Sequence, residues 1–198
     1  MIFDQDVNVQ QHTTITGYQF SAVKARYNLD AMEYMLGEIL VDTSPSTSGF
    51  IKQMEQCLED IATMCKKLPT AQNIMMRTSQ FNRDISQIHP QQLIKNIDPT
   101  RFRNTLKCQG LTALYDATLC GLEASEKFSQ ELANQEIDST IVMFIITDGW
   151  ENCSRLCNSP AQIKAAIERI KKNETISSLT TCLVGVNAQN AKQDLVDF

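Results

Sequence analysis

The stretch that decides the fold is residues 141–147, IVMFIIT, an unbroken apolar run that ends at Asp148. Residues 34–41 form a second, nearly continuous apolar run, which ends at Asp42. Runs of this length and composition are typical of strands that are buried on both faces of a parallel sheet. The sequence therefore predicts two central strands, each followed directly by an aspartate.

Patterns on either side of these runs complete an alternation of strands and helices. Residues 179–186, LTTCLVGV, predict a third buried strand, and residues 74–81 with 85–88 predict a hairpin at a sheet edge. Three amphipathic helices are expected, over about residues 51–68, 114–132 and 160–170. This order predicts an α/β fold with a mostly parallel central sheet, one antiparallel edge strand and helices on both faces.

Composition and charge narrow the class of partner. The 18 Lys and Arg residues against 23 Asp and Glu residues give a formal net charge of -5, the wrong sign for neutralising phosphates. No apolar run approaches the ~20 residues of a membrane span, and the N-terminus is too polar for a signal peptide. The seven cysteines lie mostly in apolar segments, as reduced thiols do. We expect a cytoplasmic domain over residues 24–198, preceded by an N-terminal arm over residues 1–23, with neither a nucleic-acid nor a membrane partner.

Oxygen-bearing side chains follow the two central strands and an intervening loop. Residues 42–46 read DTSPS, residues 110–116 read GLTALYD, and residues 147–149 read TDG. Ligands gather at the carboxyl ends of parallel strands, so we expect the oxygens of these loops to converge there. The candidate metal ligands are Asp42, Ser44, Ser46, Thr112 and Asp148. Hard oxygen donors without sulfur or imidazole favour Mg²⁺, with Mn²⁺ or Ca²⁺ as alternatives.

At these residues the chain resembles the von Willebrand factor A domain, a Rossmann-like α/β fold with a metal-ion-dependent adhesion site. That site combines a D-x-S-x-S loop with a separate threonine and a separate aspartate. The resemblance covers about residues 30–190 and is closest to stand-alone bacterial and phage members. It implies that Ser44, Ser46 and Thr112 touch the metal, and that Asp42 and Asp148 bind it directly or through water. In that family a carboxylate of the partner takes the sixth position.

The function implied by the resemblance is a non-enzymatic, metal-dependent protein-binding module, in which Mg²⁺ captures an Asp or Glu side chain of a partner. The setting it implies is a bacterial or phage assembly, including one linked to an AAA+ ATPase. Two alternatives stay open: a Mg²⁺-dependent phosphatase-like hydrolase with Asp42 as nucleophile, and a structural subunit with a vestigial metal site. The sequence lacks two features of phosphoryl-transfer enzymes. Position 44 is Ser, where such hydrolases carry a second carboxylate as acid/base, and no G-x-x-x-x-G-K-[ST] loop for a nucleotide is present.

Single residues of the site also have ordinary structural interpretations. Asp42 and Ser46 are residue types that favour a turn and a helix N-cap without any metal. Trp150, the only tryptophan, either anchors a partner at the rim of the site or packs on the helix that follows. Asp116 opens the second helix, where a carboxylate is favoured by the helix dipole.

The outer edge of the expected strand 179–186 would lack a neighbouring strand. In the family a helix and a sixth strand follow, and the twelve residues after Val186 leave room for only about one short helix. We therefore expect either a fragment of a longer protein, or an edge protected by the arm, a neighbouring chain or a partner. Within the arm, residues 13–23 have the β-branched and aromatic content for that role.

Overall fold

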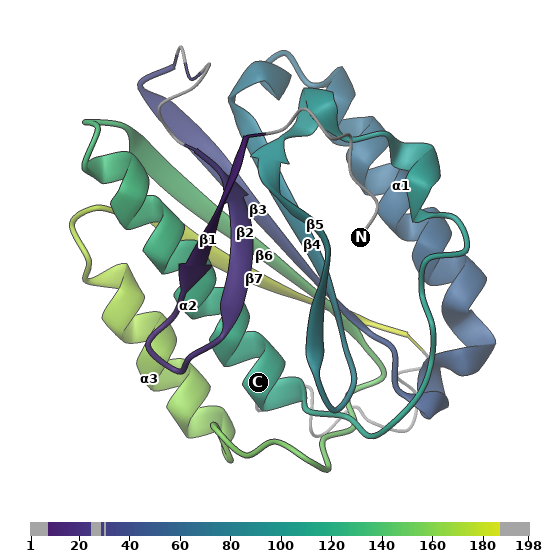
Figure 1. Ribbon diagram of the computed structural model, residues 1–198. Coiled ribbons are helices and arrows are strands. Elements are labelled where there is room, and N and C mark those ends of the chain that lie inside the picture. The colour runs from purple at the N-terminus through teal and green to yellow at the C-terminus, as the bar shows by residue number, and fades with distance from the viewer. Residues whose placement is uncertain (1–7, 25–28, 30, 187–198) are drawn as a thin grey trace.

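A computed structural model of the chain describes residues 8–24, 29 and 31–186. Seven strands form one sheet in the order β1-β2-β5-β4-β3-β6-β7 (Figure 1). The strands are β1 (Val9–Thr13), β2 (Gln19–Val23), β3 (Glu33–Asp42), β4 (Ile74–Phe81), β5 (Ile85–Leu93), β6 (Asp138–Thr147) and β7 (Ser178–Gly185). The α-helices are α1 (Ile51–Lys67), α2 (Leu114–Ala133) and α3 (Pro160–Lys171). Four 3₁₀ helices lie between them: η1 (Pro45–Phe50), η2 (Ala71–Asn73), η3 (Ile94–Asn96) and η4 (Pro99–Phe102).

The centre of the sheet is parallel, which confirms the predicted fold class. Strand β3 pairs in parallel with both β4 and β6, and β7 pairs in parallel with β6. Val41 lies opposite Ile146, so Asp42 and Thr147 finish neighbouring strands at the same end of the sheet. The two aspartates that follow the central apolar runs are thereby brought to one edge.

The expected antiparallel edge is wider than the sequence predicted. Strand β5 is antiparallel to β4, but it continues to Leu93 and is not the last strand. Strand β5 includes Pro90. This residue lies at a shift in the register with β4, between the pairs Thr78–His89 and Met76–Gln92. A proline is tolerated in a strand at such an irregularity because it has no N–H to donate. Strand β2 then pairs in parallel with β5, and β1 pairs antiparallel with β2.

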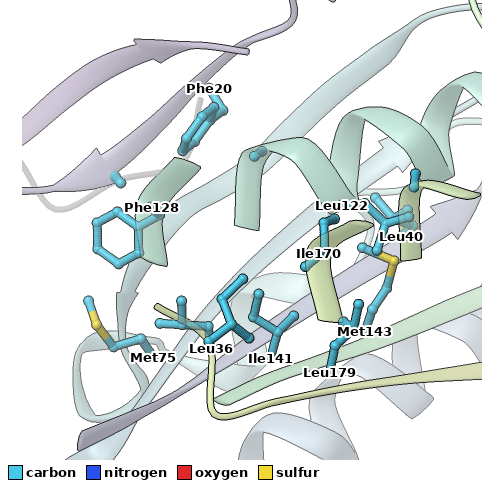
Figure 2. Packing of buried hydrophobic residues seen from close by; sticks show 14 of the residues in the cluster. Phe20, Leu36, Leu40, Met75, Leu122, Phe128, Ile141, Met143, Ile170 and Leu179 are labelled. Atoms are coloured by element: carbon cyan, nitrogen blue, oxygen red, sulfur yellow. The ribbon is translucent and has the colours of Figure 1, made fainter. Parts of the chain in front are cut away.

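Helices cover both faces of the sheet, as predicted. Figure 1 shows α1 on one face and α2 with α3 on the other. The α2 face holds the core of Figure 2, where Leu122 lies against Leu40 and Met143. Gly121 allows this close approach, because a Cβ there would lie 3.1 Å from both Leu40 Cδ1 and Met143 Cε. Within the described ranges, no helix is long and apolar enough to cross a membrane.

A buried ion pair lies at the middle of the sheet. Glu38 of β3 and Arg77 of β4 are opposite each other in the parallel register, and the guanidinium group donates to the carboxylate. Arg77 also donates to the carbonyl oxygen of Gly121 at 3.3 Å, and its Cζ lies 4.8 Å from the centre of the Phe20 ring. Strand β2 therefore covers a charge that β3 and β4 bury.

The N-terminal segment lies at the opposite end of the sheet from β7. Strands β1 and β2 form a hairpin beside β5, so the expectation that residues 13–23 cover the outer edge of β7 is wrong. In the part of the chain that the structure describes, no strand pairs with that outer edge. The hairpin is held on β5 by the pair Ala22–Gln91 and by the Gln87 side chain, which accepts from Ser21 N at 2.8 Å and donates to Ser21 O at 2.9 Å.

A buried histidine on β5 makes stability depend on pH. His89 lies 5.7 Å from the Phe102 ring, its Nδ1 is 3.0 Å from Pro90 O, and its Nε2 has no partner among the described residues. Burial lowers the pKa of His89 to about 4 from its ordinary value of 6.5. Between these values the unfolded chain binds a proton that the folded chain does not. The contribution of His89 to the unfolding free energy therefore falls as the pH drops from about 6.5 to about 4.

Replacing His89 with glutamine is expected to remove this acid sensitivity. At about 1.4 kcal/mol per pKa unit, the stability advantage of the wild type over His89→Gln shrinks by a few kcal/mol across that window. Urea unfolding of both proteins at about pH 7 and about pH 4 measures the change. An advantage that is the same at both pH values contradicts the prediction.

Candidate metal-binding site

The carboxylate of Asp42 joins the loop that follows β3 to the end of β6. Asp42 is fully buried, and its Oδ1 accepts from the backbone N–H of Ser44 at 2.8 Å. Its Oδ2 accepts from the Thr147 hydroxyl at 2.7 Å. The hydrogen bond from Ser44 N is the local turn that aspartate favours without any metal. The hydrogen bond from Thr147 crosses from β6 to β3 and belongs to the candidate site.

The hydroxyl groups of Ser44 and Ser46 face each other beside this carboxylate. Their Oγ atoms are 3.0 Å apart, with Ser44 buried and Ser46 exposed. The loop is held from within, because the Thr47 hydroxyl donates to the carbonyl oxygens of Asp42 at 3.1 Å and Ser44 at 2.9 Å. The N-cap interpretation of Ser46 does not hold, because the cap position of η1 is Ser44 and that of α1 is Phe50, neither with a side-chain cap bond.

Thr112 is attached to the loop that follows Asp148. Its carbonyl oxygen accepts from Asn152 N at 3.0 Å and Cys153 N at 3.1 Å, and its N–H donates to Asn152 Oδ1 at 2.9 Å. The neighbouring Gln109 N–H donates to Thr43 O at 2.9 Å, which ties the same loop to the loop after β3. The Thr112 side chain is buried, so its hydroxyl lies inside this loop arrangement. A threonine hydroxyl is an oxygen donor of the kind that a hard cation accepts.

Asp148 supplies a second carboxylate next to Asp42. It is buried, and within the described ranges its Oδ1 accepts one long contact, of 3.4 Å, from the Trp150 N–H. Burial raises the pKa of Asp42, hydrogen bonds from Thr147 and Ser44 oppose that shift, and the negative charge of Asp148 adds to it. Two neighbouring carboxylates with little solvent repel each other, and a divalent cation would relieve that repulsion.

Trp150 lies at the edge of this arrangement with 53% of its surface exposed. Such exposure leaves much of the indole available to a partner. Leu111, next to Thr112, is 46% exposed. Both residues are large apolar side chains on the loops that carry candidate ligands.

Two acidic residues that the sequence did not assign to the site hold its loops in place. Glu151 accepts from the N–H groups of Tyr115, Cys153 and Ser154. Asp116 does lie in the first turn of α2, as expected, but its carboxylate accepts from three backbone N–H groups, those of Arg155, Leu156 and Cys157. The only signal for these roles was a polar stretch directly after residues 148–149.

The donor set fits a hard cation. No group of three or more His, Cys, Asp or Glu side chains that could hold a metal occurs within the described residues. What the loops bring together is two carboxylates and several hydroxyl groups. Oxygen-only donors of this kind suit Mg²⁺, Mn²⁺ or Ca²⁺.

No protein-family model and no curated protein matches the chain. Among solved structures, it is similar to an aerotolerance-related membrane protein from Bacteroides fragilis, with 16% identity and a TM-score of 0.44 over 77% of this chain and 67% of that chain. It is similar to proximal thread matrix protein 1 from the mussel byssus, with 17% identity and a TM-score of 0.49 over 83% of this chain and 39% of that chain. A third is the vWF domain of the type V pili tip protein Mfa5 from Porphyromonas gingivalis, with 14% identity and a TM-score of 0.41 over 61% of this chain and 40% of that chain. The chain spans 39% to 67% of these proteins' lengths, and likenesses of this strength carry no conclusion about function.

Proposed function

We propose that this protein is a metal-dependent protein-binding module of the von Willebrand factor A type. In this proposal Ser44, Ser46 and Thr112 hold Mg²⁺, and Asp42 and Asp148 bind it directly or through water. The observation that carries the proposal is the Asp42–Thr147 hydrogen bond, which joins the ends of β3 and β6 where the two loops begin, with the Ser44–Ser46 hydroxyl pair beside it.

The chemistry of the donors explains how such a site would capture a partner. A Mg²⁺ ion held largely by neutral hydroxyls keeps much of its positive charge, so it attracts an incoming carboxylate. The chain's own residues position the hydroxyls, and the internal hydrogen bonds of Thr47 and Glu151 keep the loops rigid before any partner arrives. An Asp or Glu side chain of a protein partner is the ligand we propose.

The hydrolase alternative is less well supported by the same geometry. A nucleophilic aspartate needs an oxygen that faces the substrate. Asp42 is fully buried, and both of its oxygens already accept hydrogen bonds, from Ser44 N and Thr147 Oγ1. We therefore propose a binding role without catalysis.

The chemistry of the cysteines supports an intracellular setting. All seven are free thiols, in a chain whose buried and half-buried cysteines serve as small apolar residues. We place the module in the cytoplasm, where a link to an AAA+ ATPase assembly of bacterial or phage type remains the expectation from the family resemblance.

Metal titration tests the proposal directly. Calorimetry with Mg²⁺ is expected to find one site, because one set of loops carries the donors. In an NMR titration, Mn²⁺ should broaden first the amide signals around Ser44, Thr112 and Asp148, since paramagnetic broadening falls steeply with distance. A glycine-flanked aspartate peptide, Gly-Gly-Asp-Gly-Gly, should then bind in Mg²⁺ and be released by EDTA.

The opposite results are equally clear. Broadening centred elsewhere, or peptide binding that is indifferent to EDTA, contradicts metal capture. Hydrolysis of a generic phosphate ester that disappears in Asp42→Asn would replace the binding module with the hydrolase.

A further inference from the structure

A cavity of about 380 Å³ lies beside the candidate metal site. Its walls come from four places: the β1–β2 turn, the β4–β5 turn, the first turns of α2, and the loop before α3. The cavity and the site share loops, because Cys153 lines the cavity while its N–H donates to Thr112 O at 3.1 Å. A partner bound at the metal would therefore extend naturally over this cavity.

Two arginines converge on the cavity from different loops. Arg83 comes from the β4–β5 turn and Arg155 from the loop before α3, and both are exposed. Burial raises the pKa of the Cys153 thiol, the negative charges of Glu151 and Asp116 add to that shift, and the positive charges of both arginines oppose it. In the described part of the chain, neither arginine has an ion pair or a side-chain hydrogen bond.

The acidic groups nearby are largely occupied by the protein itself. The carboxylate of Asp116 accepts three backbone N–H groups, and that of Glu151 accepts from three backbone N–H groups and the Ser154 hydroxyl. Asp84, in the β4–β5 turn, is the remaining carboxylate that lines the cavity. Asp84 and Asp116 balance the formal charge of the two arginines in the lining, but within the described residues neither forms an ion pair with them, so both guanidinium groups are available to an acidic ligand.

The loop between the cavity and the metal donors lies directly against Arg83. Gly110 has a φ of 76°, and its missing Cβ would lie 3.7 Å from Arg83 Cβ and 3.8 Å from Arg83 N. Arg83 is therefore packed against the loop that carries Thr112, with no side chain at position 110 between them. The exposed Leu111 follows on the same loop.

We propose that this cavity is a second subsite for the same partner: a segment that places one carboxylate at the metal places a second acidic side chain between Arg83 and Arg155. The first contact rests on the function proposed above, whereas the second depends only on the two arginines. The partner is accordingly an acidic protein segment with two carboxylates, not one.

Peptide titrations followed by NMR separate the two contacts. The probes are Gly-Gly-Asp-Gly-Gly and a set of glycine peptides with a second aspartate two to six residues after the first, all in Mg²⁺. At one spacing or more, the second aspartate is expected to improve affinity about three- to tenfold, the effect of one charge-assisted contact at a solvent-exposed position. The double variant Arg83→Gln/Arg155→Gln should lose that gain and keep the affinity for the single-aspartate peptide.

The matched control is Lys95→Gln/Arg101→Gln, which also removes two exposed positive charges, from η3 and η4. It should keep the gain, which excludes an effect of net charge. A gain absent at every spacing, or equally lost in the control, overturns the subsite. So does inorganic phosphate that shifts the cavity signals while the second aspartate adds nothing. If EDTA leaves the arginine-dependent binding intact, the subsite stands and the metal-capture proposal fails.

Discussion

Replacing Asp148 with asparagine is expected to lower Mg²⁺ affinity by about 100-fold or more while leaving the metal-free protein at least as stable as the wild type. Removing a charged ligand should cost at least the upper end of the ~10- to 100-fold that outer-shell substitutions cost. The fold should not suffer, because among the described residues the one hydrogen bond that the Asp148 side chain accepts is the long 3.4 Å contact from Trp150 N. Its negative charge also acts unfavourably on Asp42, and that repulsion disappears with the substitution.

Thermal unfolding with and without Mg²⁺ measures both halves of this prediction. A ligand that binds only the folded state raises Tm with its concentration, so the wild type should gain stability in Mg²⁺ and Asp148→Asn should not. Asp138→Asn is the matched control, since Asp138 is an exposed aspartate at the other end of the same strand, β6. An Asp148→Asn protein that keeps the full Mg²⁺-dependent rise in Tm would remove Asp148 from the site. Asp42 is a less suitable choice, because its carboxylate also joins the loop after β3 to the end of β6.

Replacing Arg77 with methionine is expected to lower the unfolding free energy by about 3–5 kcal/mol. The substitution leaves Glu38 buried without its counter-charge, and removing one partner of a buried pair has costs of this order. Burial raises the pKa of Glu38 to about 7 even with Arg77 beside it. Without Arg77 that pKa rises further, so the folded variant holds its proton to higher pH than the wild type does.

The pH dependence and a double variant distinguish the charge effect from lost packing. A raised pKa in the folded state makes stability fall as the pH rises towards that pKa, so the deficit of Arg77→Met should be larger at about pH 9 than at about pH 6. Glu38→Leu/Arg77→Met should recover most of the loss, because an apolar pair of similar volume needs no counter-charge. Urea unfolding supplies both comparisons. A double variant that is no more stable than Arg77→Met, with a deficit independent of pH, would assign the loss to packing alone.

The central strands and the end of the sheet where the site lies could be predicted because both depend on local pattern. Apolar runs predict buried strands, and parallel strands bring their carboxyl ends together, so Asp42 and Asp148 could be placed at one edge without coordinates. The pairing of Glu38 with Arg77 could not, because it depends on the exact register of β3 and β4. The signal was a lone acid in one apolar run and a lone base in the next.

The conformation of the loops around the site could not be predicted from the periodicity of apolar residues. Residues 149–159 have neither a helical nor a strand pattern, and their shape depends on Asp116 and Glu151, which bind N–H groups on both sides of the loop. The place of the N-terminal hairpin was missed for a similar reason. Its partner on β5 is distant in sequence, and a strand that Pro90 interrupts gave no sign of extending to Leu93.

The attachment of that hairpin also orders the assembly of the chain. Strand β2 meets the rest of the sheet through one register pair with β5, 69 positions later, and through the Gln87 side chain. Thr16, in the turn between β1 and β2, donates to Glu123 of α2, a residue still further along the sequence. Contacts this distant cannot form until β4, β5 and α2 have been made and packed. During synthesis the hairpin therefore leaves the ribosome before any surface exists to receive it, and Phe20 stays exposed until docking closes over Arg77.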